Sequence, residues 1–269
     1  MRDIPKLPEP PYADYDSPEI KVGVFSKAFP SLAFYCRVSR AVFKAARTAK
    51  QGNFTDAEWY HDAWLIRDAF ENTGSTISIK GTEHIAKLEE PCVFIGNHMS
   101  TAETFMLATM ILPYCPVTFV IKQALMDYPV FKHVMRTRDP IVVGRVNPRE
   151  DLKAVMGGGQ ERLKAGTSII IFPQKTRSDN FNREGFNTIG VKLAKRAGVP
   201  VIPLALKTNA WSNGKKFKDF GPFRPHEDVH FEFGAPLRIE GSDKQAHEAV
   251  IEFIESRMKQ WGVGVEGGE

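Results

Sequence analysis

The sequence predicts an α/β fold: a largely parallel, twisted sheet flanked by helices and preceded by an N-terminal pair of amphipathic helices. Short apolar runs alternate with longer segments of helical periodicity, which is typical of a parallel sheet covered on both faces. The 269 residues, 42% of them hydrophobic, are enough to bury a sizeable core in one main domain. We therefore expect an N-terminal part over residues 1–74, the main domain over residues 75–262 and a disordered tail over residues 263–269.

The N-terminal part combines a proline-rich start with two helical patterns. Residues 1–18 contain five prolines and little periodicity, so they are expected to be extended or mobile. Residues 22–50 carry apolar residues at helical spacing with basic residues between them, and Ser31 is a candidate restart of that helix. Thr55 and Glu58 form a capping box for a second helix. A basic amphipathic helix with aromatic residues is typical of a membrane interface. The alternatives are that the helices pack on the main domain or pair in a dimer.

Strands and helices are expected to alternate along the main domain. The strands are short and apolar, and they are expected at residues 92–96, 117–121, 139–145, 167–172, 199–206 and 230–233. The helices are expected after Ser100 to residue 112, and at residues 149–165, 187–197 and 246–261. The longest uncharged stretch is the 18 residues from 104 to 121. Two prolines interrupt it, so a helix followed by a strand explains it better than a membrane span.

A histidine and a carboxylate lie five residues apart at one strand-to-helix turn. His98 follows the strand over residues 92–96 and precedes the helix that Ser100 and Glu103 are expected to cap. Open α/β sheets place their sites at the carboxyl ends of strands. A carboxylate there can hold an imidazole in one tautomer, as a general base requires. The alternative is that Glu103 only caps a helix and His98 is a turn residue.

Polar residues also follow the other predicted strands. Asn97 precedes the histidine, Lys122 follows the second strand, and Arg145 ends the third. The strand over residues 167–172 runs directly into a turn with two cations, whose residues are Pro173, Gln174, Lys175, Thr176 and Arg177. A Val-Pro pair begins the strand over residues 199–206.

These four blocks, in this order, resemble the glycerolipid acyltransferase family, which includes the lysophosphatidate and glycerol-3-phosphate acyltransferases. In that family one strand ends in Asn-His, followed by four residues and an aspartate. A second strand ends in arginine, a third runs into Phe-Pro-Glu-Gly-Thr-Arg-Ser, and a fourth carries a Val-Pro or Ile-Pro pair. The resemblance covers roughly residues 75–240.

The resemblance implies the fold of the glycerolphosphate acyltransferases and the transfer of a fatty acyl group from acyl-CoA or acyl carrier protein. The acceptor would be a hydroxyl or amine of a lysophospholipid-like lipid. His98 would be the general base and Glu103 would orient it. No cofactor is expected beyond the donor substrate. The implied substrate-binding residues are Asn97, Lys122, Arg145, Gln174, Lys175, Thr176 and Arg177.

Direct transfer is expected, because no activated nucleophile accompanies the histidine. Backbone N–H groups at the start of the following helix are candidates to stabilise the oxyanion. The alternative is a non-catalytic lipid-binding or membrane-surface scaffold protein on the same fold.

The chain departs from the family pattern at three positions. Glu103 stands where the family has aspartate and adds one methylene. Gln174 and Lys175 replace Glu-Gly, which removes a negative charge and adds a positive one. Our hypothesis is that this change alters the acceptor, so that it is not ordinary lysophosphatidate or carries extra negative charge. The alternative is that Lys175 faces solvent and Gln174 repeats the hydrogen bond of the glutamate.

The excess positive charge is concentrated around these cations. Residues 122–196 contain 15 Lys and Arg against 7 Asp and Glu, whereas the whole chain has a formal net charge of +4. Such a segment suits a phosphorylated acceptor, a coenzyme A phosphate, an acidic carrier protein or an anionic membrane surface.

Other partners and locations are not expected. No nucleic-acid-binding module is recognisable, and the remaining histidines lack partners at metal-ligand spacing. No export signal is present, so we expect a cytoplasmic protein attached peripherally to the cytoplasmic face of the membrane.

Overall fold

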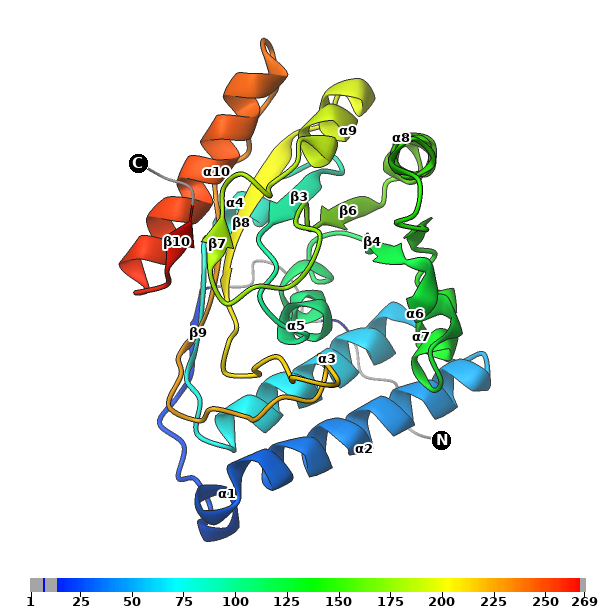
Figure 1. The fold of residues 1–269 in the computed structure, drawn as a ribbon. Coiled ribbons are helices and arrows are strands. Elements are labelled where there is room, and N and C mark those ends of the chain that lie inside the picture. The colour runs from blue at the N-terminus through cyan, green and yellow to red at the C-terminus, as the bar shows by residue number, and fades with distance from the viewer. Residues whose placement is uncertain (1–6, 8–13, 267–269) are drawn as a thin grey trace.

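The computed structural model describes Leu7 and residues 14–266, and an eight-stranded sheet runs through its centre (Figure 1). The order of the strands is β1-β2-β9-β8-β3-β6-β4-β5. Their bounds are β1 Tyr15–Asp16, β2 Ile77–Lys80, β3 Val93–Gly96, β4 Val117–Lys122, β5 Ile141–Val143, β6 Ser168–Ile171, β8 Val201–Lys207 and β9 Val229–Phe233. In this described sheet, β1 pairs with β2 and β8 with β9 in antiparallel fashion, and the other neighbours are parallel. The prediction of a largely parallel sheet is therefore confirmed.

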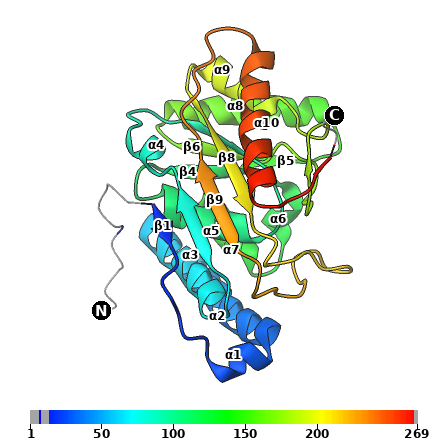
Figure 2. The same cartoon turned by 90° about the vertical axis from the view of Figure 1, so that its left-hand side faces the viewer.

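Helices cover both faces of the sheet (Figures 1 and 2). One face carries α8 (Pro148–Lys164), α9 (Ile189–Ala197) and α10 (Asp243–Gln260). The other carries α2 (Pro30–Lys50), α3 (Asp56–Glu71) and α5 (Ala102–Ile111), with α7 (Phe131–Thr137) against α2. The short helices are α1 (Val24–Ala28), α4 (Glu83–Ala86) and α6 (Gln123–Asp127). Among the described residues, no helix is both long and apolar enough to cross a membrane.

The central strands are buried on both faces, which explains why their sequences are continuous apolar runs. In β3, Phe94 joins the core shared with α2, α3 and α5, whereas Val93 and Ile95 join the core shared with α8, α9 and α10. β6 repeats this alternation, with Ile170 on the first side and Ile169 on the second. The sheet is thereby fixed from both sides, and its carboxyl edge is a rigid place for a site.

The helices at the N-terminus differ in detail from the prediction. The helix expected over residues 22–50 is broken at Phe29 into α1 and α2. Pro30 rather than Ser31 begins α2, because the first position of a helix needs no N–H donor. Thr55 is the N-cap of α3 as predicted, and its hydroxyl accepts the N–H of Glu58 at 3.3 Å.

The expected division at residue 75 does not correspond to a boundary in packing. Phe34 of α2 and Phe70 of α3 are fully buried in the same core as Phe94 of the sheet. β1 also joins the sheet as an edge strand beside β2, so this part of the proline-rich start is extended as expected. Residues 1–6 and 8–13 lie outside the described residues.

The C-terminal segment is more ordered than predicted. β10 (Val265–Glu266) pairs in parallel with β7 (Phe181–Asn182), and the N–H of Phe181 donates to the carbonyl of Gly264 at 2.9 Å. The expectation of a disordered tail is therefore wrong for residues 263–266, because non-local backbone pairing leaves no trace in local composition. Residues 267–269 lie outside the described residues.

A glycine substitution tests the close approach between β9 and the turn after β2. Gly81 has φ +75°, and a Cβ there would lie 2.1 Å from the backbone oxygen of Phe233. Gly52 has the same φ, but its Cβ would meet nothing within 4 Å. We expect Gly52→Ala to lower the free energy of unfolding by about 1–2 kcal/mol, the cost of the left-handed conformation. Gly81→Ala should lower it by about 2 kcal/mol more, because backbone must move. Equal losses in urea unfolding would contradict this contact.

Candidate active site

His98 and Glu103 meet at the turn between β3 and α5. The Nδ1 atom of His98 lies 2.8 Å from Oε1 of Glu103. The imidazole also stacks on the ring of Phe172, with centroids 4.6 Å apart and 7° between the planes. The histidine side chain is 18% exposed, whereas the glutamate side chain is fully buried. The pair predicted from the sequence therefore exists, with the imidazole facing outward and its carboxylate partner sealed behind it.

The buried carboxylate of Glu103 is surrounded by donors. It accepts the backbone N–H groups of Met99 at 2.8 Å and Ser100 at 2.9 Å, and the hydroxyl of Thr208 at 2.6 Å. Burial alone raises the pKa of this carboxyl, but the hydrogen bonds from His98 and Thr208 outweigh burial and hold the pKa below its ordinary value. Glu103 is thus an ionised acceptor.

The predicted capping box is only half correct. Glu103 reaches back to the N–H of Ser100 as expected, but Thr101 is the N-cap of α5, one residue later than predicted. The hydroxyl of Ser100 accepts the N–H of Ala102 at 3.0 Å. The N–H groups of Met99 and Ser100 are used by Glu103, so these two groups are not available to an oxyanion.

Asn97 has a structural role that the sequence prediction of substrate binding missed. Its side-chain amide donates to the carbonyl of Leu206 at 2.8 Å and accepts the N–H of Leu206 at 2.8 Å. The residue is 1% exposed. Because both ends of the amide are bound to the backbone of β8, Asn97 fixes the position of the turn that carries His98 rather than facing a substrate.

The turn after β6 holds the backbone of His98 on both sides. The Oε1 atom of Gln174 accepts the N–H of His98 at 2.7 Å, and the N–H of Ser178 donates to the carbonyl of His98 at 3.0 Å. Gln174 is buried, whereas Lys175 is exposed. Gln174 thus positions the histidine, and the side chain of Lys175 faces solvent.

The predicted cations converge beside this turn. Partial burial lowers the pKa of the Lys122 ammonium below its ordinary value. The positive charges of Arg145, Arg177 and Lys218 lower the same pKa further, so the four side chains lie within electrostatic reach of one another. We call these four residues the cation cluster. Such a cluster creates a positive potential at the edge of the sheet where His98 is partly exposed.

Two members of the cluster are held by neighbouring groups. Arg145 has φ +59°, and the carboxylate of Asp151 accepts its backbone N–H at 3.0 Å. The guanidinium of Arg145 donates to the carbonyl of Lys175. Arg177 donates to the hydroxyl of Thr101 and pairs with Asp219 at 2.8 Å. Arg145 therefore contacts the turn after β6, and Arg177 connects that turn to the turn between β3 and α5.

Three site residues were missed from the sequence. Thr208 directly follows β8, so its place at the carboxyl end of a strand was an available signal. Lys218 and Asp219 lie in the long connection between β8 and β9. Lys218 donates to the hydroxyl of Thr176 at 2.7 Å. Only the folded connection brings these two residues to the site, so spacing along the sequence does not reveal them.

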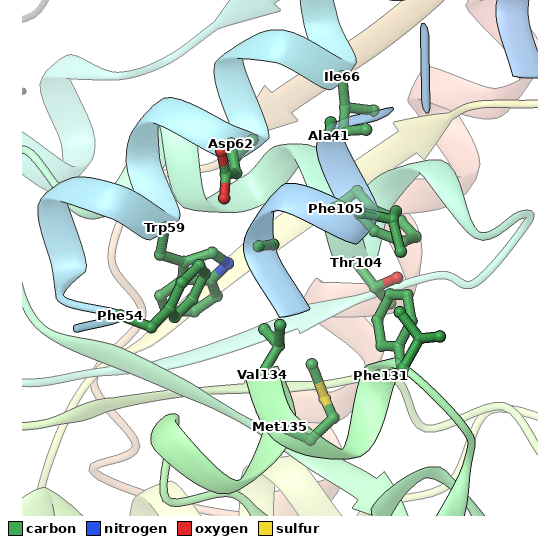
Figure 3. A pocket seen from close by; sticks show the side chains of 14 residues that line it. Ala41, Phe54, Trp59, Asp62, Ile66, Thr104, Phe105, Phe131, Val134 and Met135 are labelled. Carbon is green, nitrogen blue, oxygen red and sulfur yellow. The ribbon is translucent and has the colours of Figure 1, made fainter. Parts of the chain in front are cut away.

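An apolar pocket lies on the other side of α5 (Figure 3). It has a volume of about 50 Å³, and α2, α3, α5 and α7 contribute its walls. Phe105 and Phe131 are part of these walls, and their rings pack edge to face with centroids 5.0 Å apart. Thr104 and Phe105 follow Glu103 directly, so the pocket shares its helix with the candidate base pair. Among the described residues, no group of three or more His, Cys, Asp or Glu is arranged to hold a metal ion.

Comparisons with known proteins identify relatives of this chain. The family model described as acyltransferase matches residues 76–207. A 1-acyl-sn-glycerol-3-phosphate acyltransferase of Pseudomonas aeruginosa is 35% identical over 198 residues, which are 74% of this chain and 70% of that protein. The chloroplastic 1-acyl-sn-glycerol-3-phosphate acyltransferase of Brassica napus is 30% identical over 131 residues, but this chain spans only 36% of that protein's length.

The fold has a counterpart among solved structures. The crystal structure of the 1-acyl-sn-glycerophosphate acyltransferase of Thermotoga maritima matches with a TM-score of 0.64 and 18% identity, over 86% of this chain and 93% of that chain. At this identity the match shows the fold alone. The relative from Pseudomonas aeruginosa and the acyltransferase family model define the class of protein: the chain belongs to the glycerolipid acyltransferase family and is an acyltransferase enzyme.

The hydroxyl of Thr208 gives a test of the buried network. Because the pKa of folded Glu103 is depressed, its carboxylate contributes stability above the ordinary pKa, and that contribution is lost as the pH falls through the folded pKa. Thr208→Val removes a donor to the charged form, so we expect a loss of about 1.5–3 kcal/mol at pH 7. The loss should shrink on acidification. Thr208→Ser, which keeps the hydroxyl, is the control. A loss that is the same at pH 7 and pH 3 in urea unfolding would mean that Thr208 contributes by packing.

Proposed function

We propose that this enzyme transfers a fatty acyl group from an acyl thioester to the free hydroxyl of a phosphate-bearing lysolipid, with His98 as general base. One observation carries the proposal: the ionised, buried Glu103 lies 2.8 Å from Nδ1 of His98. A carboxylate only accepts hydrogen bonds, so Nδ1 carries the proton and Nε2 the lone pair. An outward-facing imidazole in this tautomer is ready to accept a proton from an acceptor hydroxyl.

The reaction follows from this arrangement. Nε2 takes the hydroxyl proton as the acceptor oxygen attacks the thioester carbonyl, and Glu103 stabilises the imidazolium that forms. The carbon–sulfur bond then breaks, and the imidazolium returns the proton to the leaving thiolate. No enzyme-bound acyl group is needed, and the nearby cations contribute positive potential for the oxyanion.

The cation cluster supports a phosphate-bearing acceptor. Arg177 has a planar fork suited to phosphate, and Lys122 and Arg145 add positive charge beside it. The relatives from Pseudomonas aeruginosa and Brassica napus are named for 1-acyl-sn-glycerol 3-phosphate, which is a phosphate-bearing lysolipid. The idea that Gln174 and Lys175 select a different acceptor has little support from the geometry. Gln174 is engaged with the backbone of His98, and Lys175 faces solvent.

The type of acyl donor and the binding site of the acyl chain are inferred from the charge and polarity of the surface. Acyl-CoA and acyl carrier protein both present a thioester next to phosphate, so both suit the cation cluster. The pocket of Figure 3 offers apolar walls for an acyl chain, but its volume of about 50 Å³ holds only part of one. A full chain requires Phe105 and Phe131 to separate.

Substitution of the base pair tests the mechanism. We expect His98→Ala to lower turnover by roughly two to four orders of magnitude, the usual contribution of a general base. Glu103→Gln should lower turnover less, because an amide still orients the ring but does not stabilise the imidazolium. Release of free thiol from acyl-CoA, dependent on lysophosphatidate, is the measurement, and unfolding curves confirm that the variants fold. Lys164→Ala, at the end of α8, is the control. Near-normal turnover in folded His98→Ala would exclude this mechanism.

We also propose peripheral attachment to a membrane through α1 and the start of α2. These helices pack against the core, yet several of their large apolar side chains are exposed. The exposed side chains are Val24, Phe25, Phe29 and Leu32. Such a surface with basic neighbours suits a lipid interface. The buried faces of α2 and α3 belong to the core, so deleting residues 1–74 would unfold the protein rather than release it. The cytoplasmic side of the membrane stays a prediction from the sequence.

Point substitutions therefore test the attachment. Phe25→Ser together with Phe29→Ser should weaken binding to vesicles by at least about tenfold, because two exposed aromatic side chains no longer leave water. Turnover with an acceptor dissolved as monomer should not change. Leu152→Ser on α8, where the leucine is 40% exposed, is the matched control. Unchanged sedimentation with vesicles would locate the contact elsewhere.

A further inference from the structure

The connection between β8 and β9 exposes an unusual run of side chains. Residues 215–220, which we call the 215–220 loop, have the sequence Lys-Lys-Phe-Lys-Asp-Phe. Phe217 is 73% exposed and Phe220 is 60% exposed, and the three lysines are also exposed. In Figure 2 this connection extends outward beyond the end of β8. Exposed aromatic side chains next to several lysines are typical of a surface that binds an anionic lipid membrane.

The 215–220 loop is tied to the candidate active site by its polar side chains. Asp219 pairs with Arg177 at 2.8 Å and accepts the hydroxyl of Thr101 at 3.1 Å. Lys218 donates to the hydroxyl of Thr176 at 2.7 Å. The carboxylate of Asp219 is therefore bound to Arg177, the same guanidinium that would bind the phosphate of the proposed acceptor. The Asp219 side chain is 40% exposed and the Arg177 side chain 15%, so solvent reaches this ion pair mainly from the side of the carboxylate.

The base of the loop rests on the helix that carries the exposed apolar surface. Phe220 lies 5.8 Å from the ring of Tyr35, whose hydroxyl donates to the carbonyl of Gly221 at 2.5 Å. The N–H of Phe223 donates to the hydroxyl of Ser31 at 3.0 Å. Leu32, which is 55% exposed, follows Ser31 directly. The loop thus continues the apolar surface of α1 and α2 toward the active site.

We propose that the 215–220 loop binds an anionic lipid bilayer beside the active site, and that this binding separates Asp219 from Arg177 so that the acceptor phosphate replaces the carboxylate. The proposal rests on the proposed function for the identity of the acceptor, whereas bilayer binding by the loop stands apart from it. Phe217 and Phe220 leave water when the loop enters the bilayer surface, and the lysines pair with anionic headgroups. Because Asp219 is part of the same short loop, movement of the tip draws the carboxylate away from Arg177.

Vesicle binding tests the surface without any turnover. Phe217→Ser together with Phe220→Ser should weaken sedimentation with phosphatidylglycerol-containing vesicles by at least about tenfold, because two aromatic side chains no longer enter the bilayer. Leu152→Ser is the control. Wild-type binding should be weaker to pure phosphatidylcholine vesicles, since the lysines then lose their anionic partners. Unchanged binding of the double variant, or loss of acyl-carrier-protein use with vesicle binding intact, overturns the proposal. The second result would assign the loop to the carrier protein.

A single substitution tests whether Asp219 competes with phosphate for Arg177, because the two possible roles of Asp219 predict opposite changes in affinity for lysophosphatidate. If Asp219 competes with phosphate, Asp219→Asn should tighten the binding of monomeric short-chain lysophosphatidate, measured by calorimetry without donor, by about threefold to tenfold. It should also abolish the increase in acceptor affinity that empty anionic vesicles give the wild-type protein. Weaker lysophosphatidate binding in Asp219→Asn would mean that Asp219 orients Arg177, and it would overturn the proposed exchange. If neither protein transfers acyl groups, the proposed function fails while both binding tests retain their meaning.

Discussion

The enclosed carboxylate of Glu103 is the constraint on which the rest of the site depends. A fully buried charge is strongly unfavourable unless donors compensate for lost water, and here the compensation comes from His98, two backbone N–H groups and Thr208. These donors belong to the β3–α5 turn and to the end of β8, so satisfying one charge fixes two parts of the chain. The imidazole is held by the same network, so the single tautomer that the proposed base requires is a consequence of how that charge is buried.

Parallel strands make this arrangement possible, since they bring their carboxyl ends to one edge. His98 follows β3, Lys122 ends β4, Arg145 follows β5 and Gln174 follows β6. The edge then divides into two parts of different character. Beside β3 and β8 the polar groups are buried and paired, whereas toward β4 and β5 the cations are exposed. A base needs fixed geometry, and an anion-binding surface needs access, so the division matches the two tasks of an acyl transfer.

The parts of this structure that local sequence determines were predictable. Continuous apolar runs identified β3, β6 and β8, and the spacing of His98 and Glu103 identified their contact. Non-local contacts were not predictable. Nothing near Asn97 in the sequence shows that its amide is used by Leu206, and the two-residue strands β1 and β10 exist only through their partners. Asp219 reaches Arg177 through a long connection whose path depends on α2. The site was therefore predictable in its chemistry and only partly in its geometry.

The contacts of Glu103 explain why a side chain one methylene longer than aspartate suits this position. The carboxylate lies in the first turn of α5 and must contact the N–H groups of residues 99 and 100, the imidazole of His98 and the hydroxyl of Thr208 at once. These donors lie before the helix and across the sheet, so the longer side chain suits a carboxylate that bridges both. Gln174 completes the enclosure by binding the N–H of His98. The neutral amide of Gln174 accepts this hydrogen bond without adding a negative charge to the turn. Of the three departures from the family pattern, Glu103 and Gln174 therefore both bind His98, whereas Lys175 is exposed.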